Sequence, residues 1–408
     1  MAYGLRSVGA INLLACVVVF AIPHECHAQL CGKMHDLPSP AGGGSALGVS
    51  HTGAIIVGHA SVWPHGQRSL MWDTDSILTD LTPFVGESMA MGVSDDGRFV
   101  VGWRSTAGIV SPYRWRESEG VRDLGVSHAV AWKSSHDGSR VVCYGTIADA
   151  QRAYLWTDRE GIIDLGVLPG ESEAVSTAIS PEGSTVVGFS IRNAAPWPST
   201  EKQYSAFRWT AAEGMQSLGT LGGRDSYAYG VSEDGRVIVG SSRDDVGVAR
   251  AFRWEGGEMS AIGPPNSCAY GVSADGSVVV GAIYGTGNST SRGFRWTATS
   301  GWQDIGTLGG SVSHAWGVSG NGLVIVGSSN DSNGTQSPFR WIAEPSLADY
   351  DGDYFLQITD FLDFIDDFGS CQHQPAPCGS FGNPDVNGDT IIDILDFLDF
   401  FEAFGQGC

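Results

Sequence analysis

The segment AYGVSEDGRVIVG (Ala228–Gly240) decides the fold, because it recurs along the chain. Two further copies read AYGVSADGSVVVG (Ala269–Gly281) and AWGVSGNGLVIVG (Ala315–Gly327). Each copy predicts a short apolar strand, a tight turn and a second strand rich in Val and Ile. Asp-Gly and Asn-Gly suit this turn because it needs a positive φ, which glycine adopts without steric penalty. The segment therefore predicts a β-hairpin.

The hairpin turn occurs seven times in the chain. Its copies are Thr52-Gly53, Asp96-Gly97, Asp137-Gly138, Glu182-Gly183, Asp234-Gly235, Asp275-Gly276 and Asn321-Gly322. Successive glycines are 44, 41, 45, 52, 41 and 46 residues apart. The third copy departs most, with Ala131-Trp132-Lys133 where the others have Gly-Val-Ser and with Cys143 where they have Gly. A period of this length predicts a repeat architecture.

Two more strands complete each copy. The third segment is an aromatic triplet: Leu70-Met71-Trp72, Tyr113-Arg114-Trp115, Tyr154-Leu155-Trp156, Phe207-Arg208-Trp209, Phe252-Arg253-Trp254, Phe294-Arg295-Trp296 and Phe339-Arg340-Trp341. Its alternation predicts one buried face and one face that carries Arg in most copies. The fourth segment is found at Val121–Gly125, Ile162–Gly166, Met215–Gly219, Met259–Gly263 and Trp302–Gly306. Four short strands in about 45 residues match a propeller blade.

The two ends of the array complement each other. The seventh copy stops after Trp341 without a fourth segment, and an unpaired fourth segment, Met34-His35-Asp36-Leu37, precedes the first copy. If this N-terminal strand completes the last blade, the ring has no exposed edge. An open stack of hairpins does not explain the match. We therefore predict an all-β, seven-bladed β-propeller over residues 29–343, closed by an N-terminal strand.

The copies resemble the extracellular repeats of the HAF family. The Ala-Phe-Arg-Trp and Gly-Val-Ser-x-Asp-Gly blocks carry the resemblance, which covers Met34 to Trp341. It implies secretion and a propeller-like array, and no established reaction.

Residues 1–28 have the features of a signal peptide. Arg6 is followed by an apolar run, Ile11 to Ile22, and by small residues before a cut after Ala28. Leu13-Leu14-Ala15-Cys16 offers a lipid anchor as the alternative, but the apolar run continues past Cys16. No second apolar run follows, so we expect no transmembrane span in the mature chain and a secreted, extracellular or cell-surface location.

Charge and cysteine content limit the partners. The net charge is −22, and 13 Asp and Glu with no Lys or Arg lie between Asp349 and Cys408. Phosphates would be repelled, so we expect no nucleic-acid partner. Export leaves six cysteines, which allow 15 disulfide pairings: Cys31, Cys143, Cys268, Cys371, Cys378 and Cys408. In the tail, Cys371 has two candidate partners, Cys408 and Cys378.

The acidic tail contains two loops with calcium-ligand spacing. Oxygen ligands are expected at loop positions 1, 3, 5, 7, 9 and 12, with a main-chain carbonyl at position 7. The first loop supplies Asp349, Asp351, Asp353, Phe355, Gln357 and Asp360, and the second supplies Asp385, Asn387, Asp389, Ile391, Asp393 and Asp396. Each loop leads into a segment with apolar residues on one helical face. We therefore predict calcium (Ca2+) as the cofactor of a small α-helical domain.

This tail resembles a dockerin, an EF-hand-like domain of paired calcium loops, and its ending Phe404-Gly-Gln-Gly-Cys408 resembles the GC-type tails of secreted bacterial proteins. It covers residues 349–408, after a linker at 344–348. The resemblance implies a cohesin-like or cell-envelope partner. Two departures are Tyr354 and Thr390 at loop position 6, which is usually glycine.

The sequence contains no nucleophile elbow, zinc motif or phosphate loop. The Asp and Glu of the turns are interpreted as turn formers. The triplet Arg is interpreted as a bridge between blades or a cap on carbonyls, with a carboxylate-binding ring as the alternative. Six tryptophans lie outside the triplet, and exposed ones would stack on sugar rings: Trp63, Trp103, Trp132, Trp197, Trp302 and Trp316. We predict a non-catalytic binding protein with a polysaccharide or protein ligand on the propeller; the alternative is a secreted glycosidase or lyase.

Overall fold

The computed structural model describes residues 29–30, 32–40, 43–62, 66–83, 86–147, 150–193, 202–285, 290–343 and 355–356. All the regular elements in these residues are β-strands, so the described part of the chain is all-β. No helix in that part is long and apolar enough to cross a membrane. The chain divides into two units, one of Met34–Ile342 and one of Met1–Lys33 with Ala343–Cys408.

In the first five copies of the repeat, each copy forms its own four-stranded antiparallel sheet. Copy one consists of β3 (Gly44–Val49), β4 (Ile56–Val62), β5 (Gly66–Trp72) and β6 (Leu78–Asp80). Copy two consists of β7 (Ser88–Val93), β8 (Val100–Thr106), β9 (Ile109–Arg116) and β10 (Gly120–Asp123). Copy three consists of β11 (Ala129–Ser134), β12 (Arg140–Ile147), β13 (Ala150–Thr157) and β14 (Gly161–Asp164). Copy four consists of β15 (Glu173–Ile179), β16 (Thr185–Asn193), β17 (Lys202–Thr210) and β18 (Gly214–Ser217). Copy five consists of β19 (Gly222–Val231), β20 (Ile238–Asp244), β21 (Ala249–Glu255) and β22 (Glu258–Ala261).

The last two copies share one eight-stranded sheet, in which a single parallel bridge between Ser291 and Val312 links them. Copy six consists of β23 (Ser267–Val272), β24 (Val279–Tyr284), β25 (Ser291–Thr297) and β26 (Gly301–Asp304). Copy seven consists of β27 (Gly309–Val318), β28 (Val324–Asp331) and β29 (Gln336–Ala343), and β2 (Gly32–Asp36) is its fourth strand.

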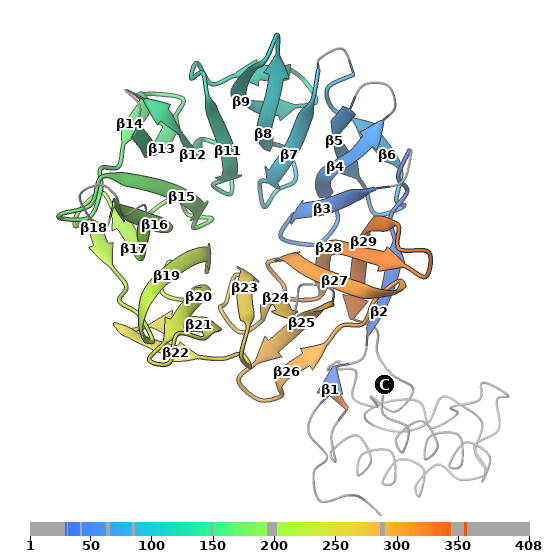
Figure 1. Ribbon diagram of the computed structural model, residues 1–408. Helices are drawn as coiled ribbons and strands as arrows, with labels where there is room; N and C mark the ends of the chain where they lie inside the picture. The colour runs from blue at the N-terminus through green and yellow to red at the C-terminus, as the bar shows by residue number, and fades with distance from the viewer. Residues whose placement is uncertain are drawn as a thin grey trace, which may run out of the picture. The chain divides into compact units, whose positions relative to one another are not determined.

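The sheets are arranged around a central axis, and the first strand of each copy lies nearest to it (Figure 1). Backbone hydrogen bonds link hairpin turns of successive copies. The His51 N–H donates to the Asp95 carbonyl (3.1 Å), and the His136 N–H donates to that of Pro181 (2.7 Å). The Asn321 N–H of the last copy donates to the His51 carbonyl of the first (3.2 Å). The last copy is therefore bonded directly to the first.

The N-terminal strand pairs with the last copy, as the complementary ends of the array predict. Strand β2 is hydrogen-bonded to β29, and the Leu37 N–H donates to the Pro338 carbonyl (2.9 Å). The Trp72 indole N–H donates to the carbonyl of Pro38 (2.9 Å). Leu37 is buried in one apolar cluster with Trp72 of copy one and Val326 of copy seven. This segment thus joins the first and last copies through its backbone and its side chains.

The buried face predicted for the aromatic triplet is confirmed at its first residue, while the third residue, a Trp, is buried in copies one, three and seven and half-buried in the others. Its first residue is almost fully buried in every copy: Leu70, Tyr113, Tyr154, Phe207, Phe252, Phe294 and Phe339. Apolar clusters form where successive sheets face each other; one of them joins Leu155 of copy three to Phe207 of copy four. The core is therefore divided among the contacts between sheets, as the repeat predicts.

The register of the third copy corrects our alignment. Ala131 pairs with Cys143 as Ala228 pairs with Gly240, so Lys133 occupies the position of Gly230 and not that of a serine. A Cβ added to Gly240 would lie 1.9 Å from the carbonyl oxygen of Tyr227, so this position requires glycine in copy five. In copy three the Cys143 side chain is accommodated and buried.

The turns and fourth strands match the prediction with small shifts. The seven turn glycines all have positive φ, for example +72° at Gly235. Each fourth strand predicted to end in glycine ends before it; β18, for example, ends at Ser217, and Gly219 has a φ of +80°. Copy one also has a fourth strand, β6, that the sequence alignment did not contain.

In the second unit, β1 (Gln29–Leu30) pairs antiparallel with β30 (Phe355–Leu356). The predicted signal peptide and linker lie outside the described residues, as does the predicted α-helical domain except for Phe355 and Leu356.

Candidate functional site

A cavity of about 430 Å³ lies on the axis of the Met34–Ile342 unit. Each innermost strand contributes the residue at one shared position of the repeat. These residues are Leu47, Met91, Trp132, Thr177, Tyr229, Tyr270 and Trp316. The second and third strands of copies three and four add Tyr144, Gln151, Phe189, Ile191, Lys202 and Tyr204. The cavity is therefore built from every copy of the repeat, and copies three and four supply most of its wall.

Aromatic rings form a continuous belt along this wall, in which Tyr227 lies outside the cavity lining and links Tyr204 to Tyr229. Ring centroids are 5.9 Å apart for Phe189–Tyr204, 4.9 Å for Tyr204–Tyr227, 6.3 Å for Tyr227–Tyr229, 5.6 Å for Tyr229–Tyr270 and 4.6 Å for Tyr270–Trp316. Trp132 and Tyr144 stack separately, with centroids 6.2 Å apart. Burial raises the pKa of Tyr229 and of Tyr270. Their hydroxyls therefore stay protonated, and that of Tyr270 is hydrogen-bonded to the hydroxyl of Tyr284.

Lys133 places a positive charge in the cavity. The strand register shifts between Ala131 and Lys133, and this β-bulge explains why the consecutive residues Trp132 and Lys133 both line it. Glycine occupies the Lys133 position in five other copies, and the Lys133 side chain lies over Gly92 of copy two. Burial lowers the pKa of Lys133 to about 8, and the charge of Asp95 partly opposes this shift.

The remaining charge in the cavity is already paired. Lys202 lies 3.1 Å from Glu173, which is outside the lining. Among the described residues that line the cavity there is no Asp or Glu. A glycosidase needs two carboxylates about 5 to 10 Å apart, and the described lining does not supply them. This arrangement suits binding through ring stacking, hydroxyl groups and one cation.

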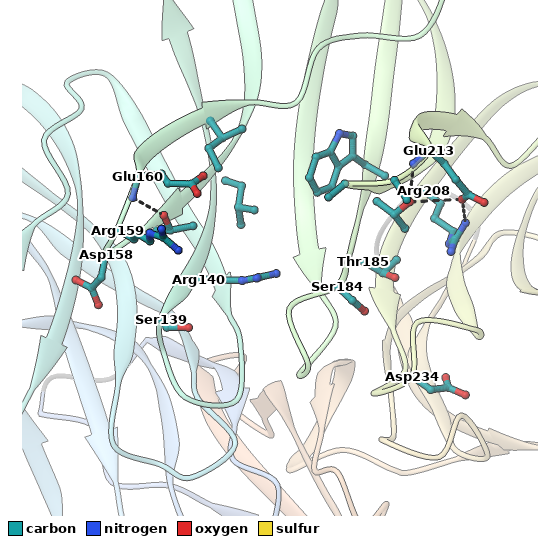
Figure 2. Close-up of a pocket in the computed structure, with 17 residues that line it drawn as sticks. Ser139, Arg140, Asp158, Arg159, Glu160, Ser184, Thr185, Arg208, Glu213 and Asp234 are labelled. Carbon is teal, nitrogen blue, oxygen red and sulfur yellow. Dashed lines mark hydrogen bonds and ion pairs between the residues drawn. The ribbon is translucent and has the colours of Figure 1, made fainter.

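A larger groove of about 860 Å³ lies between the sheets of copies three and four. In Figure 2, Asp158, Arg159 and Glu160 lie on one side of it and Arg208 and Glu213 on the other. Two of its carboxylates are engaged: Glu213 pairs with Arg208 (2.7 Å), and Asp158 pairs with Arg114 and Arg122. Because the groove contains both positive and negative side chains, and many of them are already paired, its charge does not indicate a particular class of ligand.

The groove arises because the aromatic triplet of copy three has a leucine where most other copies have an arginine. In copy two, Arg114 spans to copy three, where it donates to the Gly138 carbonyl (2.8 Å) and pairs with Asp158 (2.7 Å). In copy three the same position is Leu155, which lines the groove. Met71 takes the position in copy one and lines a groove of about 510 Å³.

The bridging role predicted for the triplet Arg is therefore confirmed for some copies. Arg340 of copy seven also reaches the next sheet, where it donates to the Thr74 carbonyl of copy one (2.8 Å). Arg208 and Arg253 instead pair within their own sheets.

The turn carboxylates are hydrogen-bonded as turn formers. The backbone N–H of Arg236 and the hydroxyl of Ser232 donate to Asp234 and hold its pKa below the usual range. At the inner turns, His51 and His136 both lie near Asp95, at 3.8 and 3.6 Å.

The predicted calcium ligands fall almost entirely outside the described residues. Phe355 is the exception: it lies in β30 and pairs with Leu30. Of the six cysteines, Cys143 and Cys268 are buried and form no disulfide. Burial raises the pKa of Cys268 to about 12, so its thiol is unreactive. The other four cysteines lie outside the described residues and allow three pairings.

Sequence reasoning found two of the cavity tryptophans, Trp132 and Trp316, but did not place them together. It missed Lys133 and the tyrosines. The available signal was the residue before the glycine in each first strand, where an aromatic side chain recurs in copies five to seven and Trp132 stands in copy three.

Comparisons with known proteins identify the fold. No protein-family model matches the chain, and no curated protein matches its sequence. The β-propeller domain of the Trilobed protease from Pyrococcus furiosus is similar in structure, with a TM-score of 0.53 and 11% identity over 74% of this chain and 94% of that one. Oligogalacturonate lyase from Vibrio parahaemolyticus gives a TM-score of 0.54 and 10% identity over 78% and 97%. Likeness at this identity concerns the fold alone: the described part of the chain is all-β and of the β-propeller type.

Proposed function

We propose that this protein is a secreted, non-catalytic glycan-binding protein whose propeller has seven blades and binds its ligand in the axial cavity. The observation that carries the proposal is the aromatic wall around Tyr229, Tyr270 and Trp316, in a cavity whose described lining has no carboxylate. The four-strand composition of each copy and the pairing of β2 with β29 support a closed ring of seven blades.

The lining favours a sugar over a purely apolar ligand. Aromatic faces stack on the C–H faces of sugar rings, and Tyr and Trp add a polar edge. Gln151 and the protonated hydroxyl of Tyr229 supply hydrogen-bonding groups for sugar hydroxyls. The Thr177 hydroxyl already donates to the Ala228 carbonyl, and the Tyr270 hydroxyl is hydrogen-bonded to that of Tyr284. A volume of about 430 Å³ lies within the usual range for small-ligand pockets. The ligand is therefore expected to be a short stretch of a glycan.

The tail is proposed as the anchor. The two loops that begin at Asp349 and Asp385 carry the oxygen spacing of calcium sites, and calcium would neutralise part of this acidic segment. A dockerin-like domain would hold the protein on a cohesin-like or cell-envelope partner. The signal peptide at 1–28 supports export to the compartment where these partners occur.

A second candidate is a glycan lyase, and Lys133 is the observation that favours it. Burial lowers its pKa to about 8, near the value at which an amine serves as a general base. The neutral Lys133 amine would remove the proton beside the carboxylate of a uronate, and the electron pair would expel the neighbouring glycosidic oxygen.

The test is binding of the full-length protein to immobilised polysaccharides, with calcium or with a chelator. Trp316→Ala should reduce retention at least tenfold, since a stacking ring is lost. Ile109→Ala is the control, because Ile109 lies in β9 outside the cavity lining, is 46% exposed and has no ring to stack on a sugar. Equal retention of the two variants would contradict the axial site.

Two further readouts separate the remaining parts of the proposal. Retention on cell envelopes that requires calcium would support the tail as the anchor, and retention unchanged by the chelator would contradict it. The ultraviolet absorbance of an unsaturated product would favour the lyase over the non-catalytic binding protein.

A further inference from the structure

We propose that the axial cavity selects glycans that carry a carboxylate, such as uronate oligosaccharides, and that Lys133 recognises this carboxylate. The inference rests on the proposed glycan-binding function. It specifies that the ligand is negatively charged and identifies the residue that binds this charge.

Lys133 is a specific departure from the repeat. Five other copies have glycine at this position, where inner strands approach closely; a Cβ on Gly271 would lie 3.3 Å from the Cα of Gly317. Lys133 therefore stands at a position where five other copies have glycine because their inner strands approach closely. The β-bulge at Ala131 directs it into the cavity beside Trp132. A role in the architecture does not account for this side chain.

The Lys133 ammonium makes no ion pair or hydrogen bond with the described residues. The indole N–H of Trp132 is buried and also has no hydrogen-bond partner there. Two neighbouring donors are thus left without acceptors in the same wall. The Asp95 carboxylate offsets part of the cost of burying the Lys133 charge without forming an ion pair with it. A ligand that supplies oxygen acceptors to the ammonium removes more of this cost.

The positive charge of Lys133 favours an anionic ligand over a cationic one. Aromatic walls alone would also attract organic cations through their ring faces, but the Lys133 ammonium repels a cation. Lys202 is already paired with Glu173, so among the described residues of the lining Lys133 is the cation that remains for the ligand. A ligand carboxylate pairs with this ammonium while its sugar rings lie against Tyr229, Tyr270 and Trp316.

The net charge of −22 does not oppose this selection. The segment from Asp349 to Cys408 carries more than half of the excess. Exposed charges beyond about 10 Å are screened at physiological ionic strength, whereas a partly buried pair in the cavity is screened much less.

The experiment is calorimetric titration of the full-length protein with oligogalacturonate and with its methyl-esterified form, which has the same sugars without the charge. Neutral cello-oligosaccharide and benzoate are additional probes. The variants are Lys133→Met, Lys133→Arg and Arg236→Met. Arg236 is the matched control for charge, since it is 81% exposed and lies in a turn outside the cavity.

We expect the acid form to bind at least tenfold more tightly than its ester. Lys133→Met should abolish this difference, while Lys133→Arg and Arg236→Met should retain it. If Lys133→Met does not fold, the other two variants still test the assignment, because loss of the acid preference in a folded Lys133→Arg or Arg236→Met variant would contradict it.

Equal binding of acid and ester would overturn the inference and leave the proposed function standing. Binding of benzoate as tight as that of oligogalacturonate would overturn the sugar part of the inference. Absence of binding by every oligosaccharide would overturn the proposed function itself.

Discussion

The backbone N–H of Leu37, which directly follows β2, donates to the carbonyl oxygen of Pro338 in β29 at 2.9 Å, so residues from the two ends of the repeat array lie side by side. The Leu37 side chain is 1% exposed and packs with Trp72 of copy one and Val326 of copy seven. This residue therefore contributes to both sides of the junction between the first and last copies.

Leu37→Ala should lower the free energy of unfolding by about 2–5 kcal/mol, because it removes a buried side chain and leaves a cavity at the junction. Equilibrium denaturation in urea measures the change. Val246→Ala is the control: Val246 is 76% exposed and should change stability by less than about 0.5 kcal/mol. Similar values for the two variants would show that the N-terminal strand does not stabilise the junction.

Gly240→Ala should be far more destabilising than Cys143→Ala, although both residues hold the same position in the repeat. The alanine Cβ would lie 1.9 Å from the Tyr227 carbonyl oxygen in copy five, so the strands must separate. Cys143→Ala only shortens a side chain that copy three already holds. We expect a loss above about 3 kcal/mol for Gly240→Ala and about 1 kcal/mol for Cys143→Ala. A tolerated Gly240→Ala, with an unchanged thermal midpoint, would disprove the close approach.

Arg114→Met tests whether the triplet arginine joins neighbouring sheets. Arg114 is almost fully buried, donates to the Gly138 carbonyl and pairs with Asp158. Its removal should lower stability by about 2 kcal/mol, since charged hydrogen bonds between sheets are lost. Arg253→Met is the matched control, because Arg253 pairs within its own sheet with the exposed carboxylate of Glu255 and should matter by less than about 1 kcal/mol. A smaller loss for Arg114→Met than for Arg253→Met would contradict the bridging role.

Much of the fold could be predicted from the sequence because the same local pattern occurs in each copy of the repeat. Turn glycine, alternating apolar residues and aromatic triplet agree in each copy, so local preference and burial give the same answer. The pairing of β2 with β29 followed from the missing fourth strand after Trp341. The register at Lys133 was predicted wrongly, because the alignment was made on a copy in which lysine replaces the glycine that marks the position.

The axial cavity could not be predicted in the same way. Its residues are one per strand and far apart in the sequence, so only the ring geometry brings Trp132 and Trp316 to one cavity. A tyrosine before a glycine, as at Tyr229 and Tyr270, fits a buried core position as well as it fits a position that lines a cavity. The charge of Lys133 became informative only once its neighbours in the wall were known.

Asp393→Ala should lower calcium affinity more than Gln357→Ala. Both residues occupy loop position 9, but the Asp393 side chain is charged whereas the Gln357 side chain is neutral. A difference of about tenfold is expected, measured by calorimetric titration of the full-length protein with calcium. Equal losses would contradict the ranking of the two loops.

Lys133→Met should raise the free energy of unfolding at pH 7 by about 1–3 kcal/mol, and the gain should shrink as the pH rises. Burial lowers the pKa of Lys133 to about 8 in the folded protein, while the unfolded chain keeps the ordinary value of 10.5. Below pH 8 both states are protonated, so the full cost of the buried charge is present. Between pH 8 and 10.5 the unfolded chain binds more protons, so the wild-type protein gains stability with pH and approaches the variant.

The other charges around Lys133 do not produce this trend. The Asp95 carboxylate opposes the shift, Lys202 is paired with Glu173, and burial raises the pKa of Tyr144, Tyr229 and Tyr270 away from this range. Urea denaturation at pH 7 and pH 10 measures the difference between variant and wild type, with Arg236→Met as the control for loss of an exposed charge. If the difference is the same at both pH values, the Lys133 ammonium is well solvated in the free protein, and the cost that a ligand carboxylate would relieve does not exist.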